Sequence, residues 1–201
     1  CIDIYECVWV DVIGTSPPPT TAPYYPPSSG GSSSTGDFAF KTEFIHSACT
    51  GMAKMLSIQA HEGKEVVGFI TRDDNIVIAP THRHTWYTSA IRQSYVDVNN
   101  NTILVFFAEN GKWYVQASPA FGNWKYEVKA TIHTHPPGPE RNEPSGFDKT
   151  MAATYDNDAV TNGTYQLNHF FVNHTHIGQF NASELINLTP NQCNIYVGNY
   201  P

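Results

Sequence analysis

Residues 126–148 read YEVKATIHTHPPGPERNEPSGFD. Their first part mixes β-branched and aromatic residues with polar ones, which predicts a strand, and Pro136 and Pro137 stop it. A loop rich in proline follows, and Ser145 then has the character of a helix N-cap with Asp148 in the first turn. The stretch therefore predicts a strand that ends in histidines, followed by a helix that begins with a carboxylate.

The histidines of this strand are spaced as metal ligands. His133 and His135 lie two residues apart, so both imidazoles lie on one face of the strand, where they can chelate one ion. The helix would return Asp148 toward the same strand end. Two histidines and one aspartate make up the three-ligand set of a catalytic zinc site, whose fourth position is left for water. We therefore expect His133, His135 and Asp148 to bind Zn²⁺.

Two further H-x-H pairs, His82/His84 and His174/His176, show that spacing alone is weak evidence. Nine histidines in 201 residues produce such pairs by chance, and neither pair is followed by a returning carboxylate. We expect both pairs to lie in loops or turns, where the first pair could line a substrate groove.

Hydrolysis at such a site needs a base as well as a metal. Zinc lowers the pKa of a bound water from about 15.7 to about 7, which makes it a usable nucleophile. A carboxylate that does not bind the metal must then accept the proton and pass it to the leaving amine. Glu65, on the first strand expected in the domain, is the candidate for this general base.

The rest of the chain predicts a mixed α/β (α+β) fold with a central sheet flanked by helices. Helices are expected where apolar residues recur at helical spacing, and strands or hairpins where β-branched runs end at turn residues. The expected elements, in chain order, are a helix over residues 43–62 closed by Gly63, a hairpin over 65–80, a hairpin over 102–119 with its turn at Asn110-Gly111, the strand over 126–135, a helix over 145–155, and strands over 168–173 and 176–181.

Composition divides the chain into three parts. Residues 1–16 include a β-branched and aromatic run, which predicts an attachment strand or the tail of a preceding module. Residues 17–36 are rich in Pro, Gly and Ser and predict a linker. We expect residues 37–201 to form the compact domain.

Charge and cysteine usage limit the partners. The formal net charge is −7 and no Lys/Arg cluster occurs, so we expect no nucleic-acid partner, and no apolar run is long enough for a transmembrane segment. The chain begins with Cys1, which fits a lipid-anchored mature form and, with somewhat more weight, a piece of a longer polypeptide. The cysteines form no C-x-x-C pair and allow free thiols or disulfides such as Cys1–Cys7, so they leave the cellular location and oligomeric state open.

Three short motifs, taken in order, resemble the signature of the JAMM/MPN zinc metallopeptidase family, as in a divergent bacterial-type member. They are E-x-x-G at 65–68, H-x-H-P at 133–136 and S-x-x-D at 145–148. The expected order of elements over about residues 40–185 is similar as well. The resemblance implies a JAB/MPN, cytidine-deaminase-like fold, zinc ligands at His133, His135 and Asp148, and an acid/base role for Glu65. It also implies that Ser145 donates a hydrogen bond to the oxyanion.

In that family the reaction is hydrolysis of amide or isopeptide bonds in a peptide or protein substrate. Nine residues separate His135 from Ser145, more than in many members, and we expect them to shape a rim of the substrate site. Two other functions fit the same residues: a catalytically inactive binding or scaffolding module of this fold, and a cell-wall peptide amidase. A bacterial secreted or injected protein is the context that the linker and the leading strand suggest.

Overall fold

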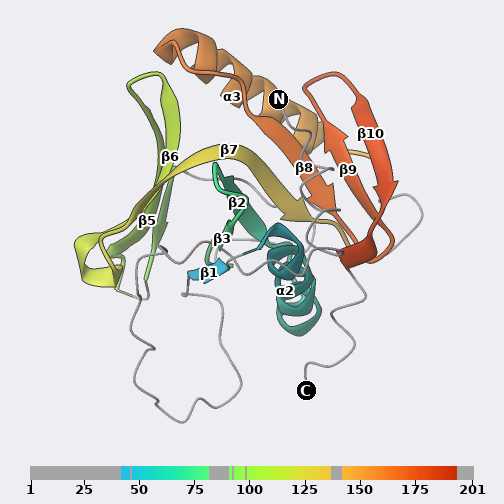
Figure 1. Cartoon of the computed structure of the whole chain (residues 1–201), viewed down its shortest axis with the longest axis horizontal. Coiled ribbons are helices and arrows are strands. Elements are labelled where there is room, and N and C mark those ends of the chain that lie inside the picture. The colour runs from blue at the N-terminus through green and yellow to red at the C-terminus, as the bar shows by residue number, and fades with distance from the viewer. Residues whose placement is uncertain are drawn as a thin grey trace, which may run out of the picture. The chain divides into compact units, whose positions relative to one another are not determined.

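The structure is a computed structural model that describes residues 42–45, 47–81, 91, 93–97, 99–136 and 142–193. The described residues form a mixed α/β fold in which a ten-stranded sheet is accompanied by two α-helices (Figure 1). The expectations for residues 1–36, the domain start at residue 37 and the pair His82/His84 lie outside the described residues.

The elements follow one another as helix and strands with short connections. In chain order they are β1 Glu43–Ile45, α2 Ala48–Glu62, β2 Val67–Thr71, β3 Ile76–Ile78, β4 Ser94–Val96, β5 Thr102–Glu109, β6 Lys112–Ala117, the 3-10 helix η1 Pro119–Phe121, β7 Lys125–Thr134, α3 Gly146–Asn162, β8 Asn168–Val172, β9 His176–Phe180 and β10 Leu185–Pro190. The main path of the sheet is β1-β3-β2-β7-β6-β5-β4, and β8, β9 and β10 extend it from β7. Only the β7–β8 pair is parallel among the described strands.

Strand β7 is the centre of the sheet. Val128 pairs with Thr71 of β2 on one side and with Trp113 of β6 on the other. One edge of β7 is shared by two strands: β6 pairs with residues 125–128, and β8 pairs with residues 130–134. Strand β2 pairs along the opposite edge. The end of β7 that carries the histidines is therefore enclosed between β2 and β8.

The two helices cover opposite faces of this sheet (Figure 1). A Cβ on Gly68 would lie 3.0 Å from Met55 of α2 and 3.1 Å from Ile132 of β7, so α2 packs on the face that Ile132 shares. Met151 and Tyr155 of α3 belong instead to the core on the other face, with the buried aromatic residues of β2 and β5. Because neighbouring side chains of a strand point to opposite faces, His133, next to Ile132, faces the α3 side.

The hairpin turns are where the sequence predicts them. Asn110 and Gly111 both have positive φ, 51° and 75°, as a two-residue turn of the mirror-image type requires. The first hairpin turns at Asp74, whose φ is 62°. Both hairpins and the strands at 168–173 and 176–181 are confirmed, whereas β4 and β10 were not expected.

The expected helix bounds need correction at two ends. Residues 43–45 are a strand, because Phe44 pairs with Val77 of β3, and the helix begins after Ser47, whose side chain accepts a hydrogen bond from the Thr50 backbone. The second helix does not end at residue 155 but continues to Asn162, since the glycine that ends it comes only at position 163.

A disulfide joins Cys49 of α2 to Cys193, which follows β10. The proposed pair Cys1–Cys7 lies outside the described residues. No described helix combines the length and the apolar character that crossing a membrane requires.

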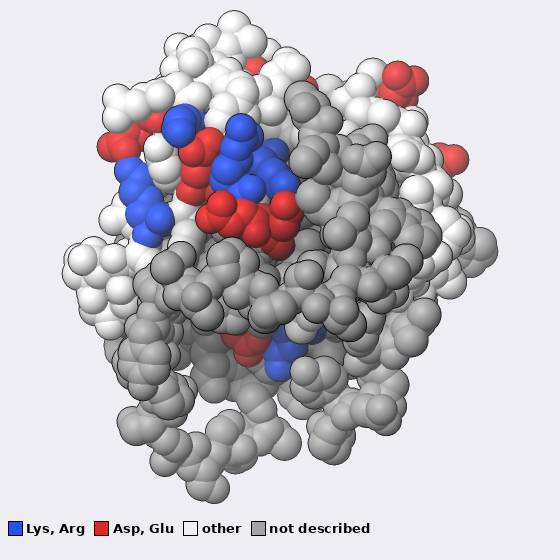
Figure 2. Space-filling model, in the orientation of Figure 1, with Lys and Arg blue, Asp and Glu red and all other residues white. Residues whose placement is uncertain are grey.

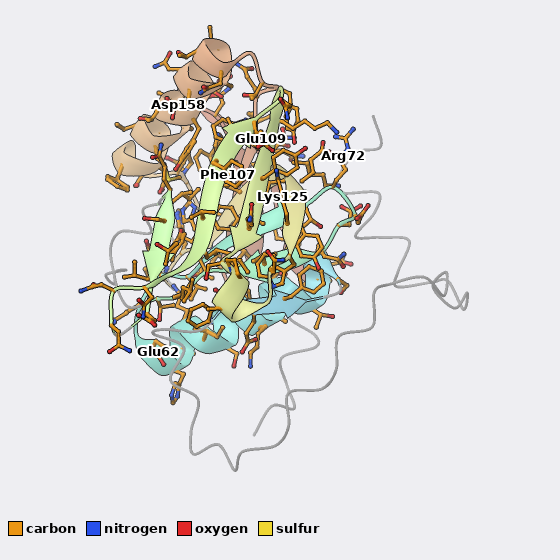
Figure 3. The ribbon with its side chains drawn as sticks, turned by 90° about the vertical axis from the view of Figure 1, so that its left-hand side faces the viewer. Glu62, Arg72, Phe107, Glu109, Lys125 and Asp158 are labelled. Carbon is orange, nitrogen blue, oxygen red and sulfur yellow. A yellow bond between two sulfur atoms is a disulfide. The ribbon has the colours of Figure 1, made fainter. Side chains whose placement is uncertain are left out.

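Charged side chains on the outer surface of β5, β6 and β7 form ion pairs of alternating sign. Lys112 Nζ lies 2.7 Å from Glu127 Oε2, and Lys125 pairs with Glu109. Figure 3 shows Lys125 and Glu109 near Phe107 on these strands, and Figure 2 shows positive and negative side chains next to each other on one face of the molecule. Exposed pairs add little stability, but they leave this surface without a patch of a single sign.

Candidate metal centre

His133, His135 and Asp148 meet at the end of β7. The two histidine Nε2 atoms are 2.9 Å apart, His133 Nε2 is 3.2 Å from Asp148 Oδ1, and His135 Nε2 is 3.3 Å from Asp148 Oδ2. Ligands bound about 2.1 Å from one tetrahedral ion lie roughly 3.4 Å from one another. All three side chains are buried, and among the described residues they form the one group of three that could hold a metal ion.

The start of α3 holds the aspartate in place. Ser145 is the N-cap, and its Oγ accepts a hydrogen bond from the Asp148 backbone at 3.2 Å, while the Ser145 backbone donates to Asp148 Oδ2 at 2.7 Å. This capping box satisfies two backbone donors and fixes the carboxylate rotamer. Because the Ser145 Oγ accepts here, its own proton is free to be donated elsewhere.

The electrostatics of the group favour a bound cation. Burial acts to raise the pKa of the Asp148 carboxyl, but the facing imidazoles of His133 and His135 outweigh it and hold the pKa well below its usual value. Burial also lowers the pKa of His133, although Asp148 acts in the opposite direction. A carboxylate and a neutral imidazole are the forms that bind a metal, and a buried negative charge is costly unless a cation compensates it.

Aromatic side chains of β8 and β9 fix the imidazole rings. Phe171 stacks on His135 with ring centroids 4.4 Å apart and an interplanar angle of 5°. Phe180 and His133 are in a T-shaped arrangement, with centroids 5.9 Å apart and an angle of 82°. Residues of another part of the chain thus pack against both imidazole rings.

The pairing of β2 with β7 places the backbone of Glu65 near the end of β7. Val67 pairs with His133, and the ladder continues as the Thr134 backbone donates to Val66 O at 2.9 Å. One further step puts Glu65 opposite His135, and residues opposite each other in an antiparallel pair lie on the same face. Glu65 is buried, with 5% of its surface exposed, and this register places its backbone next to the end of β7.

Asn173 ties down the loop between the histidines and the aspartate. It follows β8 next to His135, whose backbone donates to Val172 O at 2.8 Å. The Asn173 Nδ2 donates to Asn142 Oδ1 at 2.8 Å, and its Oδ1 accepts from the backbones of residues 175 and 176. Asn142 is three residues from Ser145, so this bond fixes the last part of the loop that leads to Asp148.

A third histidine lies close to His133. His169 of β8 is buried, and its Nδ1 lies 2.8 Å from the hydroxyl of Thr131 in β7. Burial lowers the pKa of His169 to about 4, and the charge of His133 acts in the same direction. His169 is therefore a neutral imidazole at physiological pH.

The structure separates the sequence candidates from residues that sequence reasoning missed. The pair His174/His176 lies at the β8–β9 turn as expected and does not join the metal candidates. Phe171, His169 and Asn173 were not identified, because their place depends on the parallel register of β7 and β8, which no local spacing reveals. The hydrogen bond between Asn142 and Asn173 likewise could not be predicted from the residues around either position.

Comparison with known proteins adds no assignment: no family model matches the chain, and neither a curated protein nor a solved structure gives a significant match.

Proposed function

We propose that the chain is a zinc-dependent hydrolase of amide or isopeptide bonds in a peptide or protein substrate, with a JAB/MPN-like fold. The observation that carries the proposal is the buried group of His133, His135 and Asp148, with distances of 2.9 to 3.3 Å between facing ligand atoms. The resemblance of three sequence motifs to the JAMM/MPN signature supports it.

Zinc fits this donor set better than the hard cations do. Mg²⁺ and Ca²⁺ bind mainly oxygen ligands, whereas two imidazoles with one carboxylate are typical of catalytic zinc. Zinc bound there would lower the pKa of a water molecule to about 7 and polarise a substrate carbonyl.

The residues of this chain supply the remaining steps. Glu65 accepts a proton from the attacking water and delivers it to the leaving nitrogen. The exposed Ser145 hydroxyl, whose oxygen already accepts from the Asp148 backbone, donates a hydrogen bond to the oxygen that becomes negative in the transition state. Asp148 keeps its orientation through the Ser145 backbone bond of 2.7 Å.

The disulfide between Cys49 and Cys193 supports a location outside the reducing cytoplasm. A secreted or extracytoplasmic bacterial protein, including a cell-wall peptide amidase, fits this proposal and would use the same residues.

The test combines metal content with turnover. Protein purified without chelators is expected to contain about one equivalent of zinc, and His133→Ala is expected to lose it. Glu65→Gln should keep the metal and lose at least roughly 100-fold in rate, as removal of a general base does. Less than half an equivalent of metal in the unaltered protein would count against the site. Full zinc with unchanged turnover in the Glu65→Gln variant would remove Glu65 from the mechanism, and full zinc without turnover would favour a binding module.

A further inference from the structure

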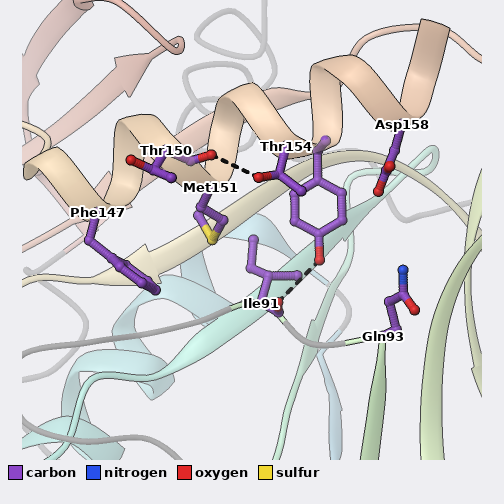
Figure 4. A pocket seen from close by; sticks show the side chains of 8 residues that line it. Ile91, Gln93, Phe147, Thr150, Met151, Thr154 and Asp158 are labelled. Atoms are coloured by element: carbon purple, nitrogen blue, oxygen red, sulfur yellow. Dashed lines mark hydrogen bonds between the residues drawn. The ribbon is translucent and has the colours of Figure 1, made fainter. Parts of the chain in front are cut away.

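A pocket of about 230 Å³ lies along one flank of α3, between this helix and the segment at Ile91 and Gln93 (Figure 4). Its helix residues run from Phe147 to Asp158 at intervals of three or four, so they share one face over roughly 16 Å. None of the residues that line it belongs to the metal candidates.

The inner surface of the pocket is apolar. It is formed by Ile91, Met151 and Tyr155, together with the ring of Phe147, which is 45% exposed. The Tyr155 hydroxyl donates to Ile91 O at 3.1 Å, so its proton is used within the wall. The surface therefore offers hydrocarbon and aromatic contact to an occupant and no hydroxyl donor.

The rim accepts hydrogen bonds. Thr150 Oγ1 donates to Gly146 O at 2.9 Å, and Thr154 Oγ1 donates to Thr150 O at 3.0 Å (Figure 4). Both hydroxyl protons are engaged inside the helix, so the oxygens offer lone pairs to the pocket. Asp158 adds an acceptor that has no cationic partner among the described residues. Among the described residues that line the pocket, Gln93 alone has a side-chain N–H group.

These features define an occupant with an apolar stem and a donor-rich, positive end. We propose that the α3 pocket binds the side chain of a lysine or arginine in the substrate. An anionic group would be repelled by Asp158, and a purely apolar one would bury the rim acceptors without partners. The volume is below the range of about 300–1,000 Å³ found for drug-sized ligands and suits one long side chain. The formal net charge of −7 also favours a basic partner.

The position of the pocket connects it to the proposed chemistry, on which the identity of the occupant as substrate rests. Phe147 adjoins Asp148 in sequence, and the pocket extends from there along the helix. An extended peptide advances about 3.3 Å per residue, so roughly five residues span the distance to Asp158. The pocket would then select a basic residue within about five positions of the bond that is cut.

Direct binding tests this without any need for turnover. Two probes, N-acetyl-lysine methylamide and N-acetyl-norleucine methylamide, are titrated separately into the full chain and followed by ¹H–¹⁵N NMR. They share a linear hydrocarbon side chain and differ in the ammonium group. We expect the lysine probe to bind at least about fivefold more tightly, with shifts along α3 and at the Gln93 side chain. Equal binding of the two probes, or shifts elsewhere in the molecule, would overturn the proposal.

Two charge variants identify the carboxylate. Asp158→Asn should abolish the preference for the lysine probe, while Asp156→Asn, which changes the net charge equally on the same helix but does not line the pocket, should keep it. Loss of preference in both variants would mean attraction by overall charge and would overturn the site. Thr154→Val, at an exposed position, should also weaken binding of the lysine probe. It replaces Asp158→Asn as the test variant if Asp158→Asn does not fold.

The experiment distinguishes an error in the proposed α3 pocket from an error in the proposed hydrolase activity. Binding is measured on chelator-treated protein, so a missing metal or absent turnover leaves the NMR result intact. If the protein does hydrolyse peptides, Asp158→Asn should reduce the ratio of kcat/KM for a lysine-containing peptide over its norleucine analogue by at least about fivefold, with unchanged metal content. An unchanged ratio would overturn the pocket and not the metal centre.

Discussion

Gly178 lies where any side chain would disturb the metal candidates, so Gly178→Ala is an informative change. In the β8–β9 register Gly178 pairs with Phe171, and a Cβ at this position would lie less than 3.0 Å from three atoms of the Phe171 ring. Phe171 is fully buried and stacks on His135. Any movement of the ring must therefore be accommodated by the packed side chains around it.

The size of the effect follows from these distances. Carbon atoms in contact are normally about 3.5 Å apart or more. The nearest of the three ring atoms, Cζ, would be 2.1 Å from the new Cβ, so this part of the ring must move by roughly 1.4 Å. Overpacking of this kind costs about 1–3 kcal/mol, and the ring that must move is the one that stacks on His135. We expect the free energy of unfolding to fall by about 3 kcal/mol and the metal affinity to fall with it.

Urea denaturation of the chelator-treated protein measures the stability, and competition with a chromogenic chelator measures the metal affinity. Gly146→Ala is the matched control, because a Cβ there meets nothing within 4 Å, and its stability should be unchanged or higher by up to about 1 kcal/mol. Phe171→Leu should cost less in the Gly178→Ala background than in the unaltered protein, since the smaller side chain relieves the overlap. Unchanged unfolding of Gly178→Ala would refute this packing argument.

Three further changes probe the surroundings of the site. Asn142→Ala should weaken metal binding about tenfold, because Asn173 Nδ2 loses its acceptor and the loop before Asp148 loosens. Asn142→Asp keeps an acceptor and should bind the metal as the unaltered protein does. Equal metal affinities of the two variants in chelator competition would contradict this. His169 has a folded pKa of about 4 against an ordinary value near 6.5, so its contribution to stability is complete above pH 6.5 and is lost as the pH falls toward 4, by about 3 kcal/mol in all. Denaturation at several pH values should show this loss of stability in the unaltered protein and not in His169→Phe. The same pH dependence of stability in both proteins would be evidence against this role of His169. Replacing Cys49 and Cys193 with alanine should lower the free energy of unfolding by about 2–5 kcal/mol. A reducing agent should lower the free energy of unfolding of the unaltered protein to the value of this double variant. If the reducing agent has no effect, the disulfide does not form in solution.

Local signals predicted much of the fold. The Asn110-Gly111 turn, the strand stopped by Pro136 and the N-cap at Ser145 each depend on a few neighbouring residues, and the structure has all three. The helix start at residue 43 was wrong because tertiary pairing with β3 decides it, while the apolar spacing around Phe44 fits a helix as well as a strand.

The candidate site could be predicted only in part. Residue types and order indicated that His133, His135 and Asp148 would meet, and the structure brings them together as a group that could hold a metal ion. The identity of that ion and the catalytic roles of Glu65 and Ser145 stay predictions. The stacking of Phe171 on His135 was out of reach, because it depends on strand pairing between distant segments.

The Cys49–Cys193 bond also determines where mechanical load would travel. The two half-cystines are 144 positions apart, and the intervening chain includes the three metal candidates, so it forms a covalently closed loop. Tension that enters before Cys49 and leaves after Cys193 crosses through the sulfur atoms and bypasses this loop. Stretching would strip β1 from β3, but the backbone tension would pass through the sulfur atoms and not along the chain through His133, until a reductant broke the disulfide.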